Sequence, residues 1–421
     1  MSTPAGSRAP IEQRLAEAGM SPLPRLAWLE IDVEALANNL RLIRQAAGGV
    51  DVYAVVKADA YGHGARETSE ALVQAGVQRL CVATFDEAVQ LRDAGNSAPI
   101  VVLYRVPGDV VGEAAELGIE LTASAPDSVA ELEAGWREEQ ASAAASGAYL
   151  TLHVHVEVET GLGRGGLVPD QVAPAIAELE AMPGIGLAGL WTHYASSDDA
   201  RASAAQTAAF ERTVASLVAA RLPVPPRHVA ASGGVFAASA PSYEAIRPGL
   251  SLYGYLPDDL TPAPDRAEAA AGLRPVMQLR ARPVRLEWAG TGAGVSYGSR
   301  WRASRPSLIA TLPIGYADGI LRSSSPGEYV LVNGRRAPIV GTVAMDAVMV
   351  DVTAVPDVTM VSEFTLLGVD GHERITAYDL ARLRNTISWE VLATMAQRIP
   401  RVYHAGPVLV GRRTLTGDRT E

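Results

Sequence analysis

A lysine ends an apolar run close to the start of the chain. Lys57 follows Ala54–Val56 in the segment AVVKADAYGHG. If this run forms a strand, the lysine lies at its carboxyl end, where the loss of water lowers the pKa of an amine. A neutral amine is a nucleophile that can form a Schiff base with an aldehyde. Position alone is weak support, because most lysines at strand ends are solvated surface residues.

Two further polar residues follow apolar runs in the same way. Arg164 lies in the glycine-rich segment TGLGRG, and His193 lies in WTHYAS. Glycines remove side-chain bulk, so a ligand can approach the arginine closely, and a planar guanidinium suits an anionic oxygen. The glycine-rich segment lacks the full spacing of a dinucleotide-binding loop. A lone histidine is more often a hydrogen-bonded structural residue.

These residues belong to a region in which short apolar runs alternate with amphipathic segments. The candidate strands are 50–56, 79–83, 100–104, 119–122, 149–158, 187–192, 227–230 and 245–247. Candidate helices between them include 65–74, 86–93, 126–138, 169–180 and 203–219. Such alternation is typical of an α/β fold of the (β/α)8 TIM-barrel type, whose chemistry lies at the carboxyl ends of the strands. An open doubly wound sheet would give a similar pattern.

The pattern changes after a segment rich in Pro, Asp and Ala, at 256–272. Strand-like runs with little helix follow at 276–287, 307–312, 329–332, 337–340, 348–352 and 363–367, with one helix expected near 386–397. We therefore expect an N-terminal extension at 1–25, a barrel at 26–260 and a smaller C-terminal β-rich domain at 261–421. The run 28–32 also predicts a strand, which could join the C-terminal domain.

Composition limits the partners and the compartment. The 421 residues carry a formal net charge of −11, which argues against nucleic acid or an anionic membrane as the main partner. Cys81 is the only cysteine, so no intrachain disulfide can form, as expected in a reducing cytoplasm. No run reaches the ~20 apolar residues of a membrane span. We expect a cytoplasmic protein without a metal site.

The segment around Lys57 resembles the cofactor-lysine motif of alanine racemases, and further matches to that family follow in order after Trp28. The resemblance implies a fold-type III pyridoxal-phosphate enzyme, whose active site is shared across a homodimer. Lys57 would carry pyridoxal 5'-phosphate, and Tyr61 would lie near its phosphate. Arg164 would contact the phenolic oxygen of the cofactor and the substrate carboxylate. His193 would lie against the pyridoxal ring and help to orient the partner's catalytic tyrosine.

Two more segments complete the cofactor site that the resemblance implies. Ser232, in HVAASGG, would bind the phosphate with the backbone amides of Gly249 and Leu250. Arg247, in RPGL, would hydrogen-bond the pyridine nitrogen. An arginine only donates and keeps its proton, so that nitrogen must accept and remain unprotonated. This weakens the ring as an electron sink and favours return of a proton to Cα over transamination.

Racemisation needs a group on each face of the planar carbanion, one to remove the α-proton and one to return it. By resemblance, Lys57 and Tyr297, in GVSYG, take these two roles, exchanged with the hand of the substrate. Tyr297 would reach into the site of the partner subunit. Met345, in GTVAMD, would contact the substrate carboxylate through its backbone. The segment IPRVY at 399–403 resembles a structural motif near the end of family members.

Four positions depart from the family pattern. Glu157 replaces a lysine that many relatives carbamylate, and its carboxylate could supply the negative charge that orients Arg164. Trp389 takes the place of a tyrosine near the phosphate and the substrate; an indole is larger and cannot accept a hydrogen bond. Ala231 and Ala344 replace a common asparagine and a common cysteine. The chemistry is therefore expected to persist, while the choice of amino acid stays open.

The leading hypothesis is a racemase that interconverts L- and D-alanine, with the role in making D-alanine for the cell wall that the resemblance implies. Racemisation of another small amino acid is an alternative. A fold-type III decarboxylase is disfavoured, because those relatives place an acid at the pyridine nitrogen, where this chain has Arg247. A non-catalytic protein that binds pyridoxal phosphate is disfavoured by the second domain and by Tyr297, although Trp389 leaves room for a weakened paralogue.

Overall fold

The computed structural model describes residues 9–146 and 150–417, which form two compact units. The barrel unit contains Leu36–Ala60 and Thr68–Arg274. The sheet unit contains the described residues up to Ala35, the short segment Tyr61–Glu67 and the residues from Pro275 onward. Among the helices described, none is long and apolar enough to cross a membrane.

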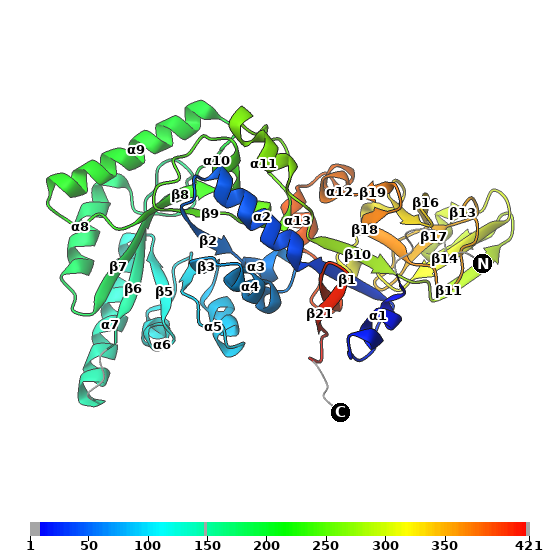
Figure 1. Cartoon of the computed structure of the whole chain (residues 1–421), viewed down its shortest axis with the longest axis horizontal. Coiled ribbons are helices and arrows are strands. Elements are labelled where there is room, and N and C mark those ends of the chain that lie inside the picture. Colours follow the sequence, from blue (N-terminus) through cyan, green and yellow to red (C-terminus); the bar gives the residue numbers. More distant parts are fainter. Residues whose placement is uncertain (1–8, 147–149, 418–421) are drawn as a thin grey trace. The chain divides into compact units, whose positions relative to one another are not determined.

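In the described part of the barrel unit, eight parallel strands close into a barrel, in which β9 pairs back with β2 (Figure 1). They are β2 (Asp51–Val55), β3 (Arg79–Val82), β4 (Ile100–Val102), β5 (Ile119–Ala123), β6 (Leu152–Glu157), β7 (Ile185–Trp191), β8 (Arg227–Ala231) and β9 (Ala245–Arg247). Closure through the pairing of Asp51 with Ala245 confirms the predicted barrel and excludes the open sheet. The ends of the strands differ from the predicted ranges by a few residues.

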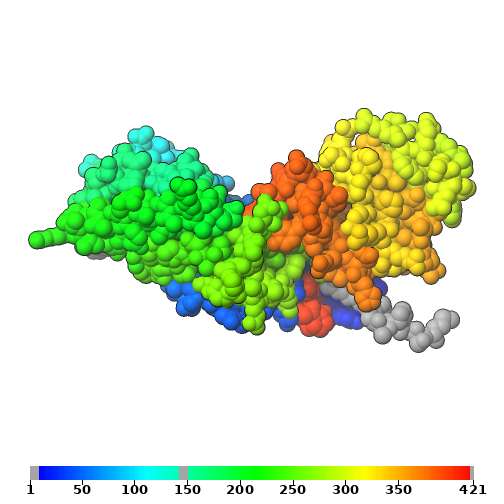
Figure 2. Space-filling view, turned by 90° about the horizontal axis from the view of Figure 1, so that it is seen from above, coloured from blue at the N-terminus to red at the C-terminus, as the bar shows by residue number. Residues whose placement is uncertain are grey.

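Helices lie before the first barrel strand, between successive strands and after the last strand. They are α2 (Val33–Ala46), α3 (Lys57–Tyr61), α4 (Ala65–Gln74), α5 (Phe85–Asp93), η1 (Gly108–Val110), α6 (Val111–Glu116), α7 (Pro126–Ser146), α8 (Pro169–Glu180), α9 (Ala200–Ala219), α10 (Ser232–Phe236), η2 (Leu250–Tyr253), η3 (Pro264–Arg266) and α11 (Ala267–Ala271). Figure 2 shows in green the surface of the segment that includes α8 and α9. Part of the segment at 256–272 is helical, since η3 and α11 lie within it.

Local sequence explains where these helices begin and which face they bury. The carboxylate of Asp199 accepts the amides of Arg201 and Ala202, at 2.9 and 3.0 Å, and so caps the start of α9. In α8 the buried residues Val172, Ile176 and Leu179 recur at helical spacing, which gives the helix one apolar face toward the barrel. Packing of such faces fixes the strands whose ends carry the polar residues.

In the described part of the sheet unit, an eleven-stranded sheet has the order β11-β14-β17-β16-β15-β18-β10-β1-β20-β21, with β19 paired to β18. The strands are β1 (Ala27–Asp32), β10 (Met277–Ala281), β11 (Arg285–Ala289), β14 (Ser307–Leu312), β15 (Tyr329–Val332), β16 (Arg335–Val340), β17 (Val348–Asp351), β18 (Phe364–Asp370), β19 (Glu373–Ile375), β20 (Arg401–Ala405) and β21 (Val408–Arg413). A separate pair joins β12 (Gly294–Val295) to β13 (Trp301–Arg302). The helices are α1 (Ile11–Glu17), η4 (Tyr297–Ser299), η5 (Tyr316–Asp318), η6 (Arg322–Ser324), α12 (Ala377–Arg384) and α13 (Ser388–Ala393).

The strand expected at 28–32 forms β1 and lies between β10 and β20. Leu29 pairs with Leu279 of β10 in antiparallel register and with Arg401 of β20 in parallel register. The run expected as one strand at 276–287 is two strands, β10 and β11. Pro283 lies between them and has no N–H to donate to a neighbouring strand, which accounts for the interruption.

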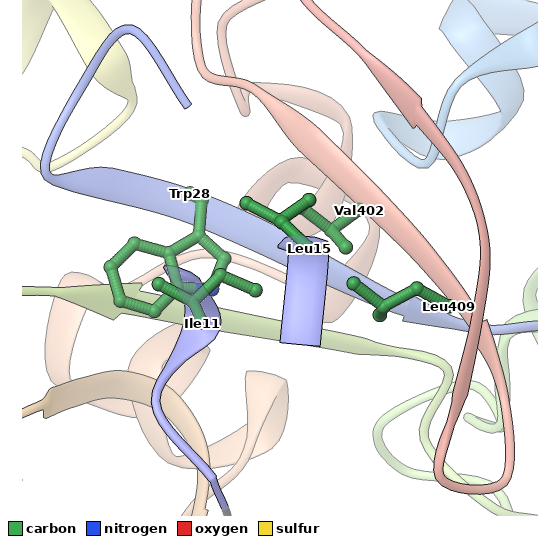
Figure 3. Close-up of a cluster of buried hydrophobic side chains, with 5 residues drawn as sticks. All are labelled: Ile11, Leu15, Trp28, Val402 and Leu409. Carbon is green, nitrogen blue, oxygen red and sulfur yellow. The ribbon is translucent and has the colours of Figure 1, made fainter. Parts of the chain in front are cut away.

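The segment that precedes β1 packs onto the same sheet. Ile11 and Leu15 of α1 form a buried cluster with Trp28, Val402 and Leu409 (Figure 3). Beside this cluster a buried ion pair joins the Arg14 guanidinium to the Glu30 carboxylate at 2.9 Å, and the Trp28 indole N–H donates to the same oxygen at 3.1 Å. The described part of the expected extension is therefore built into the core of the sheet unit.

Candidate active site

Lys57 follows β2 at the carboxyl end of the barrel. Burial lowers the pKa of its ammonium group, and the positive charge of Arg164 lowers that pKa further, while the carboxylate of Glu87 opposes the change. The residue is partly buried. This environment favours the neutral amine, as the sequence predicted for a nucleophilic lysine.

The backbone after Lys57 makes a turn of left-handed residues. Ala58, Asp59, Ala60 and Tyr61 have φ angles of 53°, 54°, 54° and 52°. A left-handed conformation destabilises the fold by about 1–2 kcal/mol for each residue with a Cβ, so the surrounding structure must hold the turn. Glu87 holds its first residue, because its Oε1 accepts the Ala58 amide at 2.6 Å. Strain of this kind next to a nucleophilic lysine is typical of a functional site.

Arg164 interacts electrostatically with both Lys57 and Glu157, but it forms no direct pair with Glu157. Arg164 is exposed, and its guanidinium carbon lies 5.7 Å from the centre of the Tyr104 ring. Glu157 ends β6 and is 5% exposed. Among the described residues no hydrogen bond or ion pair joins its carboxylate to Arg164. Burial raises the pKa of Glu157 to about 7, although the positive charges of Arg164 and Arg247 act in the opposite direction.

Arg247 ends β9 and is held from several sides. Nη1 donates to the carbonyl of His228 and to Nδ1 of the same residue at 2.8 Å. Nη2 donates to the carbonyl of Thr192 at 2.7 Å and lies 3.5 Å from His193 Nδ1. The guanidinium carbon lies 4.5 Å from the centre of the Trp191 ring. None of the hydrogen bonds described here uses Nε, which keeps one N–H donor for a ligand.

Burial and the neighbouring charges set the protonation states of Arg247 and His193. Burial lowers the pKa of Arg247 to about 10, so the guanidinium is still charged at neutral pH. Burial lowers the pKa of His193 to about 3, helped by the positive charges of Arg247, Arg164 and Lys57. His193 is therefore neutral at working pH. Since Arg247 can only donate, the proton of that imidazole belongs on Nε2.

Ser232 follows β8 and collects hydrogen-bond donors around its hydroxyl oxygen. The amides of Gly249 and Ser251 each donate to Oγ at 3.1 Å, and the hydroxyl of Ser251 donates to it at 2.9 Å. The amide of Leu250 is not among these donors. Sequence reasoning missed Ser251, although it directly follows Leu250. A group of hydroxyls and amides converging at the ends of β8 and β9 suits a phosphate.

Tyr297 belongs to the sheet unit, where its side chain is 74% exposed. Its backbone is clamped, because the hydroxyl of Thr342 donates to the Tyr297 carbonyl at 2.9 Å and Ser296 Oγ donates to the Thr342 carbonyl at 2.5 Å. Gly341 has a φ of 69°, and a Cβ there would lie 2.7 Å from the carbonyl oxygen of Val295. A glycine is thus required for the segment that supports Tyr297.

Met345 lies further along the same supporting segment and is 52% exposed. Its carbonyl accepts the amide of Ala317 at 3.0 Å. The neighbouring Asp346 forms an ion pair with Arg398 at 2.5 Å. Tyr316, which is 43% exposed, donates its amide to the Ala344 carbonyl and so ties a neighbouring loop to this segment.

The structure thus divides the predicted site residues between the two units. The barrel unit brings together Lys57, Arg164, His193 and Arg247, whose charges influence one another, and it also carries Ser232, Gly249 and Leu250. Tyr61, Tyr297, Met345 and Trp389 belong to the sheet unit. Trp389 lies in α13 and is partly buried.

A buried polar network inside the barrel was missed altogether. Arg79 donates to the Glu120 carboxylate at 2.9 Å, and Glu120 accepts from His155 at 2.7 Å. His155 and His228 share a hydrogen bond of 3.0 Å, and His228 contacts Arg247. The sequence feature that could have indicated this network is the presence of polar residues within otherwise apolar strand runs. Among the described residues, no group of three or more His, Cys, Asp or Glu side chains could hold a metal ion.

Two models of known protein families together match most of the described chain. The family model described as "Alanine racemase, N-terminal domain" matches residues 31–257. The model described as "Alanine racemase, C-terminal domain" matches residues 276–403. The two matches cover the barrel strands and most strands of the sheet unit.

Individual relatives agree with the family models. The chain is 34% identical to alanine racemase 1 of Clostridium acetobutylicum, over 90% of this chain and 95% of the relative. A solved structure of alanine racemase from Bacillus anthracis with bound L-Ala-P has a TM-score of 0.83 and 31% identity, covering 94% of this chain and 99% of that one. A solved histidine racemase from Leuconostoc mesenteroides has a TM-score of 0.79 and 29% identity, covering 91% of this chain and all of that one.

Proposed function

This chain belongs to the alanine racemase family, and we propose that it interconverts L- and D-alanine with pyridoxal 5'-phosphate bound at Lys57. The observation that carries the proposal is the convergence of Lys57, Arg164, His193 and Arg247 at the carboxyl end of the barrel, where their charges influence one another. Lys57 alone would be a weak candidate. Together with a phosphate cradle and a family whose members are named for this reaction, it becomes a specific one.

The residues of the barrel unit fit this cofactor. The hydroxyls of Ser232 and Ser251 and the amide of Gly249 would hold its phosphate. Arg247 would donate through Nε, the one guanidinium nitrogen without a hydrogen bond in the described structure, to the ring nitrogen. When bound, pyridoxal phosphate draws electrons from the α-carbon of an amino acid and makes its Cα–H bond acidic.

The reaction then needs the protein to bind the carboxylate and to move one proton. Arg164 would bind the substrate carboxylate, as its exposed guanidinium suits a planar anion. Lys57 and Tyr297 would be the two bases, one on each face of the α-carbon. The exposure of Tyr297 supports its action in the site of a second copy of the chain, so that the working form is a homodimer. The single cysteine, Cys81, is buried and free, which suits a cytoplasmic protein.

Incubation of the holoenzyme with L-alanine in D2O tests this proposal. We expect solvent deuterium at Cα together with loss of optical activity. Lys57→Ala should abolish both signals. Release of CO2 without racemisation would show a decarboxylase, and the absence of any exchange would show a binding protein.

Tyr297→Phe tests the assignment of two bases. The variant keeps the ring but loses the proton-transfer group, so kcat for racemisation should fall by about 10²–10⁴-fold. Lys57 still acts on its own face, so one enantiomer should continue to exchange its α-proton with solvent without changing hand. Equal loss of exchange from both enantiomers would contradict the assignment.

Racemisation of a different amino acid is the second candidate. Trp389 and Ala344 occupy positions where relatives commonly have tyrosine and cysteine, and a histidine racemase shares the fold of this chain. Values of kcat/KM for alanine, serine and histidine decide between the two. Alanine should be preferred by at least tenfold, and a clear preference for a larger side chain would replace it as the substrate.

A further inference from the structure

A line of hydrogen-bonded side chains runs through the core of the barrel. Arg79 is the first residue of β3, and Glu120 is the second residue of β5, so both lie toward the amino end. Arg247 is the last residue of β9, at the carboxyl end, where the active site is proposed. His155 of β6 and His228 of β8 connect the two ends, and both are fully buried.

The chemistry of the two ends fixes the direction of every hydrogen bond in this line. The Arg247 guanidinium can only donate, so His228 Nδ1, at 2.8 Å, must accept. A neutral imidazole then carries its proton on Nε2, which donates to His155 Nδ1 at 3.0 Å. His155 in turn carries its proton on Nε2 and donates to the Glu120 carboxylate at 2.7 Å. That carboxylate can only accept, and it also accepts from Arg79 at 2.9 Å.

Both histidines are neutral in this arrangement. A proton added to His228 would occupy the nitrogen that accepts from Arg247 and would place a second positive charge beside the guanidinium. Burial and the charges of Arg247 and Arg79 lower the pKa of His228 well below its usual value. Burial also lowers the pKa of His155 and outweighs the opposing effect of Glu120, with smaller contributions in the same direction from Arg79 and Arg247. The phenol of Tyr53 and the indole of Trp191 also pack against His228, and the buried thiol of Cys81 interacts electrostatically with both ends of the line.

One glycine makes room for the bond between the two histidines. A Cβ at Gly189 of β7 would lie 2.1 Å from His155 Nδ1 and 2.5 Å from His228 Nε2, the two atoms that share the bond. Gly189 does not have a left-handed φ, so a glycine is needed here because a side chain would not fit, and the backbone conformation does not require it. A methyl group there would displace the two imidazoles, because a Cβ atom cannot lie that close to either nitrogen.

We propose that Glu120, His155 and His228 are positioning residues that hold Arg247 through a one-directional chain of hydrogen bonds, with both imidazoles fixed as neutral Nε2–H tautomers. The chain occupies Nη1 and helps to leave Nε as the donor for the cofactor. This inference rests on the proposed function for the role of Arg247, while the state of the histidines does not depend on it.

The tautomers are tested first, on the wild-type holoenzyme labelled with ¹⁵N-histidine. The chain has seven histidines, and the spectra of His155→Gln and His228→Gln assign the two signals. We expect both residues to have a bare Nδ1 and a protonated Nε2 from about pH 6 to about pH 9, a range in which an ordinary histidine titrates. A proton on either Nδ1, or titration of either ring in this range, would overturn the proposal.

Gly189→Ala tests the positioning role without removing any polar group. Displacing an outer hydrogen-bond partner commonly costs about 10–100-fold in activity, so kcat should fall by about tenfold or more. KM should change little, because Arg247 does not bind the substrate carboxylate. The ¹⁵N signals of His155 and His228 should shift. Unchanged kcat together with shifted histidine signals would overturn the positioning role.

Gly186→Ala is the matched control on the same strand. A Cβ there would meet the ring of His153, at 2.8 Å from Nδ1, but that side chain is exposed and can turn away. Its kcat should stay within about twofold of wild type, since the network is untouched. Glu120→Gln serves if Gly189→Ala does not fold, because the loss of the terminal carboxylate should also lower kcat and shift the His155 signal. Unchanged kcat and spectra in that variant would overturn the proposal.

The experiments distinguish failure of the proposed function from failure of the positioning chain. If the wild-type protein does not racemise alanine, the proposed function fails, while the histidine spectra still report on the chain. If racemisation is normal but the tautomers differ from those given above, the positioning chain alone fails.

Discussion

The carboxyl group of Glu157 combines burial with positively charged neighbours. Burial raises its pKa to about 7 from an ordinary value of 4.5, although Arg164 and Arg247 favour the charged form. The folded protein thus binds this proton more tightly than the unfolded chain does. Stability from this group is complete below about pH 4.5 and declines as the pH rises toward about 7, where the folded form ionises.

Glu157→Gln removes this pH dependence. Relative to wild type, the free energy of unfolding of the variant should increase with pH, by about 2 kcal/mol between pH 5 and pH 8, because the buried negative charge is absent. Urea unfolding at fixed protein concentration measures the difference. A difference between the two proteins that is the same at both pH values would contradict the raised pKa.

The same substitution tests whether the charge serves catalysis. If ionised Glu157 orients Arg164, wild type should exceed Glu157→Gln in kcat/KM by about tenfold at pH 8, which is about 1.4 kcal/mol. The ratio should fall toward one at pH 6, where wild type carries a protonated, uncharged side chain as well. A ratio of one at both pH values would exclude the charge role.

At this scale the sequence predicts residues that follow strand ends and misses those that meet only in space. Lys57 could be singled out because it follows an apolar run, while the roles expected of Arg164 and Arg247 come from the resemblance to the family. Ser251 could not be ranked above Leu250 as a donor, because the choice depends on which amide points toward Ser232. His155 and Glu120 lie on different strands, and their contact depends on the stagger of the barrel.

At the scale of elements, the left-handed turn after Lys57 has no counterpart in sequence reasoning. The segment KADAY contains no glycine, and among its residues only Asp belongs to the types that are enriched at positive φ. Glu87 holds the start of the turn through the Ala58 amide, and at its end the Tyr61 carbonyl lies 2.9 Å from Nδ1 of His63. Local preference and tertiary structure disagree here.

A substitution to glycine within the turn measures how much the left-handed conformation destabilises the fold. Ala58 is exposed with a φ of 53°, so Ala58→Gly should stabilise the fold by up to about 1 kcal/mol, because glycine adopts left-handed angles without a Cβ clash. Ala130, exposed in the right-handed helix α7, is the matched control, and Ala130→Gly should destabilise by about 0.5–1 kcal/mol. Chemical unfolding of both variants gives the comparison, and equal signs would contradict the strained turn.

Most other elements could be predicted where the spacing of apolar residues agreed with the positions of the glycines and prolines that end helices and strands. The barrel strand β4 is a continuous apolar run, as expected for a strand buried on both faces, whereas β5, β6 and β8 contain buried polar residues as well. The interruption at Pro283 was missed, although proline is the reason for it. Helix α12 was also missed, because it has only eight residues, even though Thr376 and Asp379 form a capping box at its start. The strand β21 alternates between buried and exposed residues too weakly to be recognised.

At the scale of the whole molecule, the shared active site of the proposed homodimer can be tested by mixing inactive variants. Lys57→Ala and Tyr297→Phe should each be inactive alone. In a mixed dimer that shares its sites across subunits, one site has both lesions and the other has both wild-type residues. Random reassociation of equal amounts should therefore restore about a quarter of wild-type activity, given half mixed dimers with one working site each.

The controls for this experiment use the same two changes. A chain with both substitutions, mixed with wild type, shows whether reassociation is random. No recovery from the two single variants, despite proven exchange of subunits, would place Lys57 and Tyr297 of one chain in the same site. Residue patterns alone could not predict this arrangement, and the expectation depends on the resemblance to the family.

The position of β1 has a consequence for synthesis of the protein. Its partners β10 and β20 are made much later, since Leu29 pairs with Leu279 and Arg401. On the ribosome the barrel strands are complete once Arg247 has emerged, so the barrel can close early. Meanwhile β1 waits unpaired until β10 has been made, and its second partner, β20, follows more than a hundred residues later. Closing so long a loop is slow, and the waiting strand is the segment of the nascent chain where we expect a chaperone to bind.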